Sequence, residues 1–309
     1  MSTSSRPIEG NVPAVVTPFD EAGELLPDDF AEIVRWHLAN GADGICIAGD
    51  NGEGWALTLE DRRRIAETAV KVISGTVPLV MGASAPTARQ TIALAEVAAE
   101  AGVDAIMTGP QAYVLKATKR EIVGRFEAIH QAVPLPILLY NSPRRTGLNL
   151  DVATFGAICD AVPVVGVKEA SRDFFHLTHI IHHFGKQVPV LIGPCPFIFP
   201  GLALGARGFI STGPELFGKA AARIRAMASE NPSEESRELH YRLTRIYESL
   251  MGTGTWPAAI KAALNLLGVP AGLPREPVQP LTADDREKLE RVMGELYLLD
   301  DNPRVSQNR

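Results

Sequence analysis

The sequence predicts an α/β protein, a (β/α)8 barrel of the TIM type with a C-terminal helical extension. Eight short runs rich in β-branched residues alternate with amphipathic stretches over the first two thirds of the chain. The alternation stops after residue 213, and only helical patterns follow. Strands that alternate with helices form parallel sheets, and eight nearly equal repeats fit a closed barrel better than an open sheet.

The individual elements follow from local patterns. The predicted strands lie within residues 11–19, 42–50, 77–84, 103–110, 135–143, 162–171, 188–195 and 206–213. Helical patterns separate most of them, for example over residues 59–74 and 87–102, where Gly102 predicts the helix end. Four further helices are predicted over residues 218–230, 236–251, 256–268 and 284–299. We therefore expect a catalytic barrel over residues 1–214 and a helical extension packed on it over residues 215–309.

The composition excludes several classes of protein. The chain of 309 residues is 46% hydrophobic and 21% charged, with a net charge of −6 and no clustered Lys/Arg stripe, which argues against nucleic-acid binding. Its apolar runs are shorter than the ~18–20 residues of a membrane span, and the N-terminus lacks an apolar signal core. Cys46, Cys159 and Cys195 show no CxxC spacing, so neither a disulfide framework nor a zinc knuckle is expected. A cytoplasmic protein without nucleic-acid or membrane partners is the expectation.

The run "VVGVKEAS" places an amine in a strand that otherwise reads as buried. A period of two puts Gly166, Lys168 and Ala170 on one side and Val165 and Val167 on the other. The valines can meet the helices, so Lys168 is expected to face the barrel axis, with space left beside it by the glycine and the alanine. Lys168 is then either a structural lysine paired with an acid or a lysine with a reactive amine.

The spacing of several motifs carries a family resemblance. Tyr140 in "YNSPRRTG" stands 28 residues before Lys168 in "GVKEAS". "AVVTPFD", "GDNGEGWALTLEDR" and "WPAAIKAALNLLG" occur in the matching order around them. Over residues 8–285 the chain therefore resembles the dihydrodipicolinate synthase / N-acetylneuraminate lyase family.

The resemblance implies class I aldolase chemistry. Lys168 would attack the ketone of pyruvate or another 2-oxo acid and form an iminium, and Tyr140 would shuttle protons. Such a nucleophile must be neutral, and an apolar barrel disfavours the ammonium form. The iminium itself is an electron sink, so no metal and no further cofactor are expected. The family also implies a homo-oligomer, a tetramer made of paired dimers.

The resemblance also implies a substrate site at the carboxyl ends of the strands, where such barrels carry their chemistry. The loop from Gly49 to Glu53 matches the loop that holds the substrate carboxylate. Arg145 matches the arginine that receives the second substrate's carboxylate in the synthase. The residues expected to bind substrate are Asp50, Asn51, Gly52, Arg145, Gly193 and Ile210.

Three departures from the family pattern bear on the substrate. Asp50 and Asn51 replace two threonines of the usual G-T-T-G-E loop, so Asp50 is kept protonated, serves as a base, or meets a hydroxyl or amine of a different substrate. Ala112 stands where the synthase has a tyrosine that reaches the neighbouring subunit, and Tyr113 follows one residue later. Gly193, Pro194 and Cys195 replace a G-D-D segment. The leading interpretation is a lyase for pyruvate or a hydroxylated 2-oxo acid that works by aldol cleavage, condensation or dehydration.

Other interpretations stay open. One is dihydrodipicolinate synthase activity proper, and another is a non-catalytic barrel that binds a 2-oxo acid. A metal-dependent class II aldolase is a third. His176, His179 and His183 share one helical face, as metal ligands can, although an outer barrel helix explains the same spacing.

Overall fold

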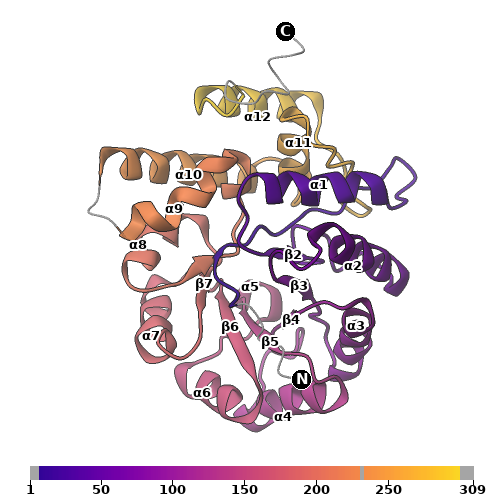
Figure 1. The fold of residues 1–309 in the computed structure, drawn as a ribbon, viewed down its shortest axis with the longest axis vertical. Coiled ribbons are helices and arrows are strands. Elements are labelled where there is room, and N and C mark those ends of the chain that lie inside the picture. The colour runs from indigo at the N-terminus through magenta and orange to yellow at the C-terminus, as the bar shows by residue number, and fades with distance from the viewer. Residues whose placement is uncertain (1–6, 230–232, 300–309) are drawn as a thin grey trace.

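The computed structural model describes residues 7–229 and 233–299 and confirms the predicted barrel. All eight strands are parallel, in the order β1-β8-β7-β6-β5-β4-β3-β2, with helices around them (Figure 1). The two ends of this order meet just beyond β1, where Ala14 bridges Cys46 and the Val15 N–H donates to the Cys46 carbonyl at 2.8 Å. These bonds close the sheet into a barrel.

The strands are short and lie inside the predicted runs, except that the first begins one residue early. They are β1 (Gly10–Asn11), β2 (Ile45–Ile47), β3 (Leu79–Gly82), β4 (Ala105–Thr108), β5 (Ile137–Asn141), β6 (Val164–Glu169), β7 (Val190–Ile192) and β8 (Gly208–Phe209). The first predicted strand, over residues 11–19, contributes only Asn11 to the β1–β8 ladder and Ala14 to the bridge with Cys46. Pro13 and Pro18 explain part of this difference, because proline has no N–H to donate.

Helices surround the strands and then continue alone. They are α1 (Pro27–Ala39), α2 (Leu59–Ile73), α3 (Ala88–Ala101), α4 (Lys119–Ala132), α5 (Pro143–Thr146), α6 (Val152–Ala161), α7 (Phe174–Phe184), α8 (Ile198–Ala203), α9 (Lys219–Ser229), α10 (Glu234–Gly252), α11 (Ala258–Leu266) and α12 (Ala283–Glu295), with 3-10 turns η1 (Cys195–Phe197) and η2 (Pro214–Phe217). Capping boxes at Thr58, Thr87 and Thr118 start α2, α3 and α4. Gly102 ends α3 with a φ of 84°, as predicted.

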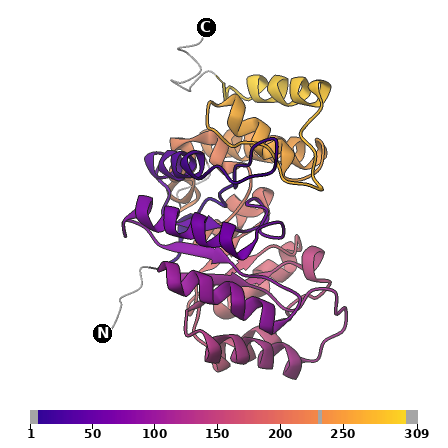
Figure 2. The ribbon, with the colours of Figure 1, turned by 90° about the vertical axis from the view of Figure 1, so that its right-hand side faces the viewer.

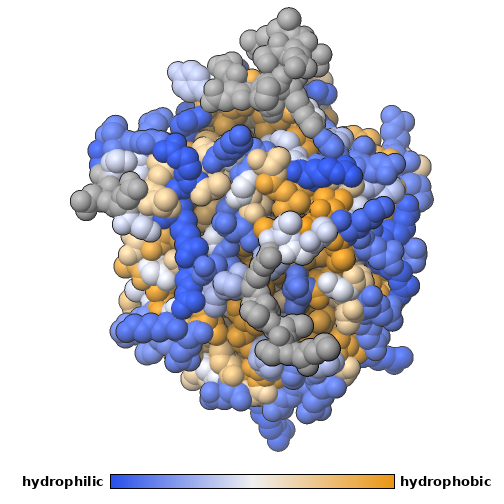
Figure 3. All heavy atoms as spheres, viewed as in Figure 1, coloured by the Kyte–Doolittle hydropathy of each residue, from blue (hydrophilic) through white to orange (hydrophobic). Residues whose placement is uncertain are grey.

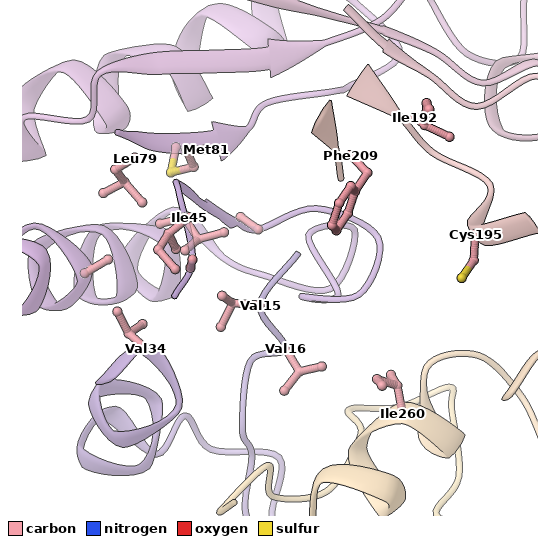
Figure 4. Packing of buried hydrophobic residues seen from close by; sticks show 14 of the residues in the cluster. Val15, Val16, Val34, Ile45, Leu79, Met81, Ile192, Cys195, Phe209 and Ile260 are labelled. Atoms are coloured by element: carbon pink, nitrogen blue, oxygen red, sulfur yellow. The ribbon is translucent and has the colours of Figure 1, made fainter. Parts of the chain in front are cut away.

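Two apolar clusters fill the barrel and its surroundings. The larger one lies between the strands and the helices and includes Val16, Phe209 and Ile260, so it also joins α11 to the barrel (Figure 4). The smaller one fills the barrel interior with Cys46, Met107, Leu138, Tyr140, Leu191, Ile210 and their neighbours. Tyr140 and Ile210 belong to this inner cluster and also border an open cavity, so the inner cluster forms the floor of the site.

The β6 strand departs from simple alternation. Ile137 pairs with Val164 and Leu138 pairs with Gly166, so Val165 is an extra residue that forms a bulge. As a result Val165 packs against the inner cluster, whereas Val167 packs with the helices, and the prediction that both face the helices was wrong for Val165. The prediction that Gly166 leaves free space was wrong as well, because a Cβ there would lie 2.9 Å from the Leu138 side chain.

The helices after β8 gather at one end of the molecule (Figures 1 and 2). A buried ion pair between Lys261 of α11 and Glu53 ties them to the loop after β2. The division of the chain after residue 214 stays a prediction.

The surface is mixed in character. On the face drawn in Figure 3, hydrophilic residues predominate along the outline of the molecule. Within the described ranges, no helix combines the length and the apolar character that crossing a membrane requires.

Candidate active site

A cavity of about 310 Å³ opens at the carboxyl ends of the strands. Its wall combines residues from the barrel with residues from the helical extension. They are Ala14, Asp50, Asn51, Tyr140, Ser142, Arg144, Arg145, Lys168, Ala170, Arg172, Gly193, Pro194, Ile210, Ser211, Thr212, Tyr247, Met251 and Trp256. Catalytic sites of such barrels lie at this end, so the cavity is the candidate active site.

Lys168 lies at the floor of the cavity. β6 presents it beside Tyr140 of β5, its partner in the ladder, and its Nζ lies 4.8 Å from the centre of the Tyr140 ring. Lys168 is only 8% exposed. No carboxylate oxygen of the described residues comes within 4.0 Å of this amine. The structure therefore favours a reactive amine over a lysine buried as half of an ion pair.

Tyr140, Asp50 and Arg145 form a chain from the floor to the mouth. The Tyr140 hydroxyl donates to Asp50 Oδ2 at 3.0 Å, and Arg145 Nε donates to the same oxygen at 2.8 Å. The Arg145 side chain is 51% exposed, so the chain ends in solvent. Burial, and then the Asp50 charge, raise the pKa of Tyr140, which keeps the phenol protonated. Burial would lower the pKa of Arg145, but the Asp50 carboxylate outweighs it and raises that pKa.

Polar side chains with unused hydrogen-bonding capacity also border the cavity. Thr212 Oγ1 donates to Asn51 Oδ1 at 3.0 Å and so orients the amide. The Asn51 Nδ2 and Ser211 Oγ atoms are buried. Among the described residues Asn51 Nδ2 has no hydrogen-bond partner, and Ser211 has only a weak hydrogen bond with the Cys195 thiol, which partly offsets the rise that burial causes in the pKa of that thiol. Buried polar groups are nearly always hydrogen-bonded, so unpaired donors at a cavity point to a polar ligand.

Glu215 is a second acidic residue near the site, although it does not border the cavity. Its Oε2 accepts the Gly213 N–H at 2.7 Å, whereas Oε1 has no partner in the described part of the chain. Burial raises the pKa of Glu215 to about 7, and the Lys168 charge opposes that rise. Burial also raises the pKa of the nearby Cys195 thiol, as expected for an unreactive buried cysteine.

A buried network fixes the ends of β5 and β6. Asn141 Nδ2 donates to Glu169 Oε2 at 2.7 Å, and the Ser171 N–H donates to Glu169 Oε1 at 2.7 Å. His176 Nε2 lies 3.4 Å from Glu169, and this hydrogen bond is the main cause of the raised pKa of His176. The network holds the strands that carry Tyr140 and Lys168. His176 thus has a structural partner, and the described residues contain no group of three potential metal ligands.

Seven of the predicted site residues border the cavity. They are Asp50, Asn51, Tyr140, Arg145, Lys168, Gly193 and Ile210. Gly52 does not border the cavity, and its role in substrate binding stays a prediction. A Cβ there would lie 2.8 Å from the Val15 carbonyl, so this glycine is required for packing inside the loop. Tyr113 is 89% exposed and also lies outside the cavity.

The sequence analysis missed several residues of the cavity wall, among them Arg144, Ser211, Thr212, Arg172 and three residues of the helical extension. Arg172 follows "KEAS" directly, so its closeness to Lys168 was visible in the sequence. Tyr247, Met251 and Trp256 come from α10 and the segment after it. Nothing in the local pattern of a helix tells which turn covers a barrel mouth.

Comparisons with known proteins identify the family. The family described as "Dihydrodipicolinate synthetase family" matches residues 7–296. The chain is 32% identical to 4-hydroxy-tetrahydrodipicolinate synthase 1 of Halalkalibacterium halodurans over 283 residues, which are 92% of this chain and 95% of the relative.

Solved structures agree with this match. A chloride-inhibited dihydrodipicolinate synthase of Acinetobacter baumannii in complex with pyruvate has a TM-score of 0.88 at 27% identity, covering 94% of this chain and 99% of that one. A prophage protein of the dihydrodipicolinic acid synthase family from E. coli, also in complex with pyruvate, gives the same four values. Members of the family are carbon–carbon lyases with a lysine Schiff base, which confirms the expected enzyme class. With the family matching nearly the whole length, the chain belongs to the dihydrodipicolinate synthetase family.

Proposed function

We propose that the protein is a lyase that forms a Schiff base between Lys168 and a 2-oxo acid, either pyruvate or a hydroxylated 2-oxo acid. One observation carries this proposal: the Lys168 amine lies on the floor of an open cavity, 4.8 Å from the centre of the Tyr140 ring, with no carboxylate of the described residues within 4.0 Å. The pyruvate complexes of the two similar structures support the substrate class.

The first step joins the amine to the substrate. The Lys168 lone pair forms a bond to the keto carbon, and the carbonyl electron pair moves to oxygen, which takes up a proton. The nitrogen loses one proton, the hydroxyl takes up another, and the C–O bond breaks to release water and leave an iminium. The iminium then accepts the electron pair of the breaking C–C or C–H bond at the neighbouring carbon.

Tyr140 and Asp50 would move the protons of this step. Tyr140 is the hydroxyl nearest to Lys168 in the ladder, and its own proton points at Asp50 Oδ2. A proton leaving the amine can pass to the Tyr140 oxygen while the phenolic proton passes to Asp50, and the return transfer protonates the departing hydroxyl. The second proton comes from solvent at the mouth. Asp50 thereby takes the place of the threonine in the family relay and acts as a base, one of the three roles predicted for it.

Two buried donors that border the cavity would hold the carboxylate beside the keto group. Asn51 Nδ2 lacks a partner in the described residues, and Ser211 Oγ has only the weak partner Cys195 there. Two neutral donors suit a carboxylate oxygen. A bound 2-oxo acid would satisfy both groups and would turn its keto carbon toward Lys168.

Borohydride trapping tests the proposal. Reduction of the wild-type protein with pyruvate or a hydroxylated 2-oxo acid is expected to add the reduced acid to Lys168, as located by peptide mass spectrometry. The Lys168→Ala variant should trap nothing and lose turnover, whereas Lys288→Ala, which removes an exposed lysine of α12, should behave as wild type. Normal turnover in Lys168→Ala would refute the covalent mechanism. Trapping without turnover of any 2-oxo acid would instead support a non-catalytic binding barrel.

We further propose that the protein works as a homo-oligomer in the cytoplasm, as expected from the sequence. Tyr113, Val114 and Leu115 expose 89%, 49% and 70% of their surface and form an apolar segment suited to an interface between copies. Light scattering after size-exclusion chromatography tests the oligomer, and Tyr113→Ser with Leu115→Ser should weaken it. A monomeric wild type would contradict it.

A further inference from the structure

An arginine of the barrel and a tyrosine of the helical extension meet at the mouth of the cavity. Arg172 donates through a terminal guanidinium nitrogen to the Tyr247 hydroxyl at 2.6 Å, and its guanidinium carbon lies 5.6 Å from the centre of the Tyr247 ring. Both residues border the cavity that contains Lys168. Arg172 has a φ of 64°, a left-handed backbone conformation that few non-glycine residues adopt. Such conformations cluster at functional sites, where the surrounding structure holds them.

The charges around the cavity are unbalanced. Arg144, Arg145 and Arg172 border it, and Asp50 is the only acid among the described residues that line it. Asp50 is already bonded to Arg145 at 2.8 Å. No described carboxylate lies within 4.0 Å of the guanidinium of Arg172 or Arg144. The wall is thus positive, although the chain as a whole has a net charge of −6.

The positive charge of the cavity wall is larger than the charge needed to balance one carboxylate of a small 2-oxo acid. That carboxylate has its own neutral donors in Asn51 and Ser211, which border the same cavity. A guanidinium has a planar fork of N–H groups that fits a carboxylate in a bidentate manner, and Tyr247 engages one of its terminal nitrogens. The described residues offer the Arg172 guanidinium no other hydrogen-bond partner, so the rest of the fork can take an anion.

We propose that Arg172, held by Tyr247, binds a second carboxylate at the end of the substrate remote from the keto group. The inference rests on the proposed function and deepens it, because it names a 2-oxo dicarboxylic acid as the substrate class. Arg172 stands four residues after Lys168, so their Cα atoms are at most ~14 Å apart along an extended chain. Two long side chains that border one cavity can therefore hold the two ends of one small molecule. Met251 and Trp256 supply apolar wall for the carbons between the ends.

Trapping with a matched pair of acids tests this inference. The probes are 2-oxoglutarate and 5-methyl-2-oxohexanoate, in which an isopropyl group replaces the distal carboxylate. The wild-type protein is expected to reach half-maximal trapping at a concentration about tenfold lower with 2-oxoglutarate, the gain typical of one charge-assisted hydrogen-bonded pair. The preference should shrink as salt is added, because the mouth is open to solvent.

Variants of Arg172 and Tyr247 show which side chains cause the preference for 2-oxoglutarate. Arg172→Ala should abolish the preference, and Arg172→Lys, which keeps the charge but not the fork, should retain part of it. Tyr247→Phe, which keeps the ring and removes the hydroxyl, should reduce it by about threefold. Arg286→Ala removes an exposed arginine of α12 that does not border the cavity and should leave the preference unchanged. Melting temperatures show whether each variant is folded.

The outcomes separate this inference from the proposed function. Equal trapping of the two probes by the wild type, or a preference that survives in Arg172→Ala, overturns the distal carboxylate site while pyruvate is still trapped at Lys168. If the wild type traps neither pyruvate nor either probe, the Schiff-base function fails and this inference fails with it.

Discussion

Replacing Lys261 by methionine should destabilise the protein strongly. Lys261 and Glu53 form an ion pair whose side chains are 1% and 0% exposed. Lys261 also donates to the Leu273 carbonyl at 2.6 Å, and Glu53 accepts the Arg275 N–H at 2.8 Å. In Lys261→Met the Glu53 carboxylate would stay buried with that backbone donor but without its counter-charge. Removing one partner of a buried pair costs about 3–5 kcal/mol.

Thermal melting measures this cost. For a chain of 309 residues the entropy of unfolding is about 0.6 kcal/mol/K, so the loss corresponds to a decrease of about 5–8 °C in Tm. Calorimetry or circular dichroism at neutral pH resolves such a change. Adding Glu53→Gln should recover part of the loss, because the unpaired charge disappears.

The matched control is an ion pair on the surface. Lys288 lies 3.1 Å from Asp285, and its side chain is 61% exposed. Lys288→Met should cost at most about 1 kcal/mol, since solvent screens exposed pairs. A Tm for Lys261→Met no lower than that of Lys288→Met would refute the reasoning. Glu53 belongs to the same loop as Asp50, so Lys261→Met should also weaken 2-oxo acid binding.

Three further predictions concern the site. Asp50→Thr puts the residue of the family pattern back into the proton relay, so it should change which product is formed more than it changes the rate of borohydride trapping. Equal losses in both would show that imine formation depends on the Asp50 carboxylate itself and would contradict this prediction. Burial raises the pKa of Glu215 to about 7 from an ordinary 4.5, so the folded state binds more protons than the unfolded state between these values. Its contribution to stability is therefore lost as pH rises from about 4.5 to about 7, by up to about 3 kcal/mol. Glu215→Gln should remove that slope from melting curves recorded across this range, and an unchanged slope would contradict the assignment. Exhaustive chelation should leave turnover unaffected, because the iminium accepts the electron pair; loss of activity that added metal restores would favour a class II mechanism.

Local patterns were sufficient to predict most of the fold. The helices predicted over residues 59–74 and 87–102 are present as α2 and α3, and Gly102 ends α3 as predicted, because the signals for such a helix lie within the helix or directly beside it. Tyr140 and Lys168 could be paired because neighbouring parallel strands carry them and their spacing matches a known family.

Features that depend on distant segments could not be predicted. The bulge at Val165 depends on how β6 registers with β5, and alternation along one strand does not encode that register. Arg172 and Tyr247 are 75 residues apart in sequence, and Lys261 meets a loop that precedes it by roughly 200 residues. The packing role of Gly52 is a further example, because the Val15 carbonyl that restricts this position comes from another loop.

The cavity draws its floor and its roof from different parts of the chain. Lys168, Tyr140 and Asp50 belong to strand ends and the loops beside them, whereas Tyr247 and Met251 belong to α10 and Trp256 follows it. The two α10 side chains that border the cavity can therefore be exchanged while the residues of the covalent chemistry stay in place. For protein engineering, this makes Tyr247, Met251 and Trp256 the positions to randomise when a catalyst for new acceptor molecules is sought from this scaffold.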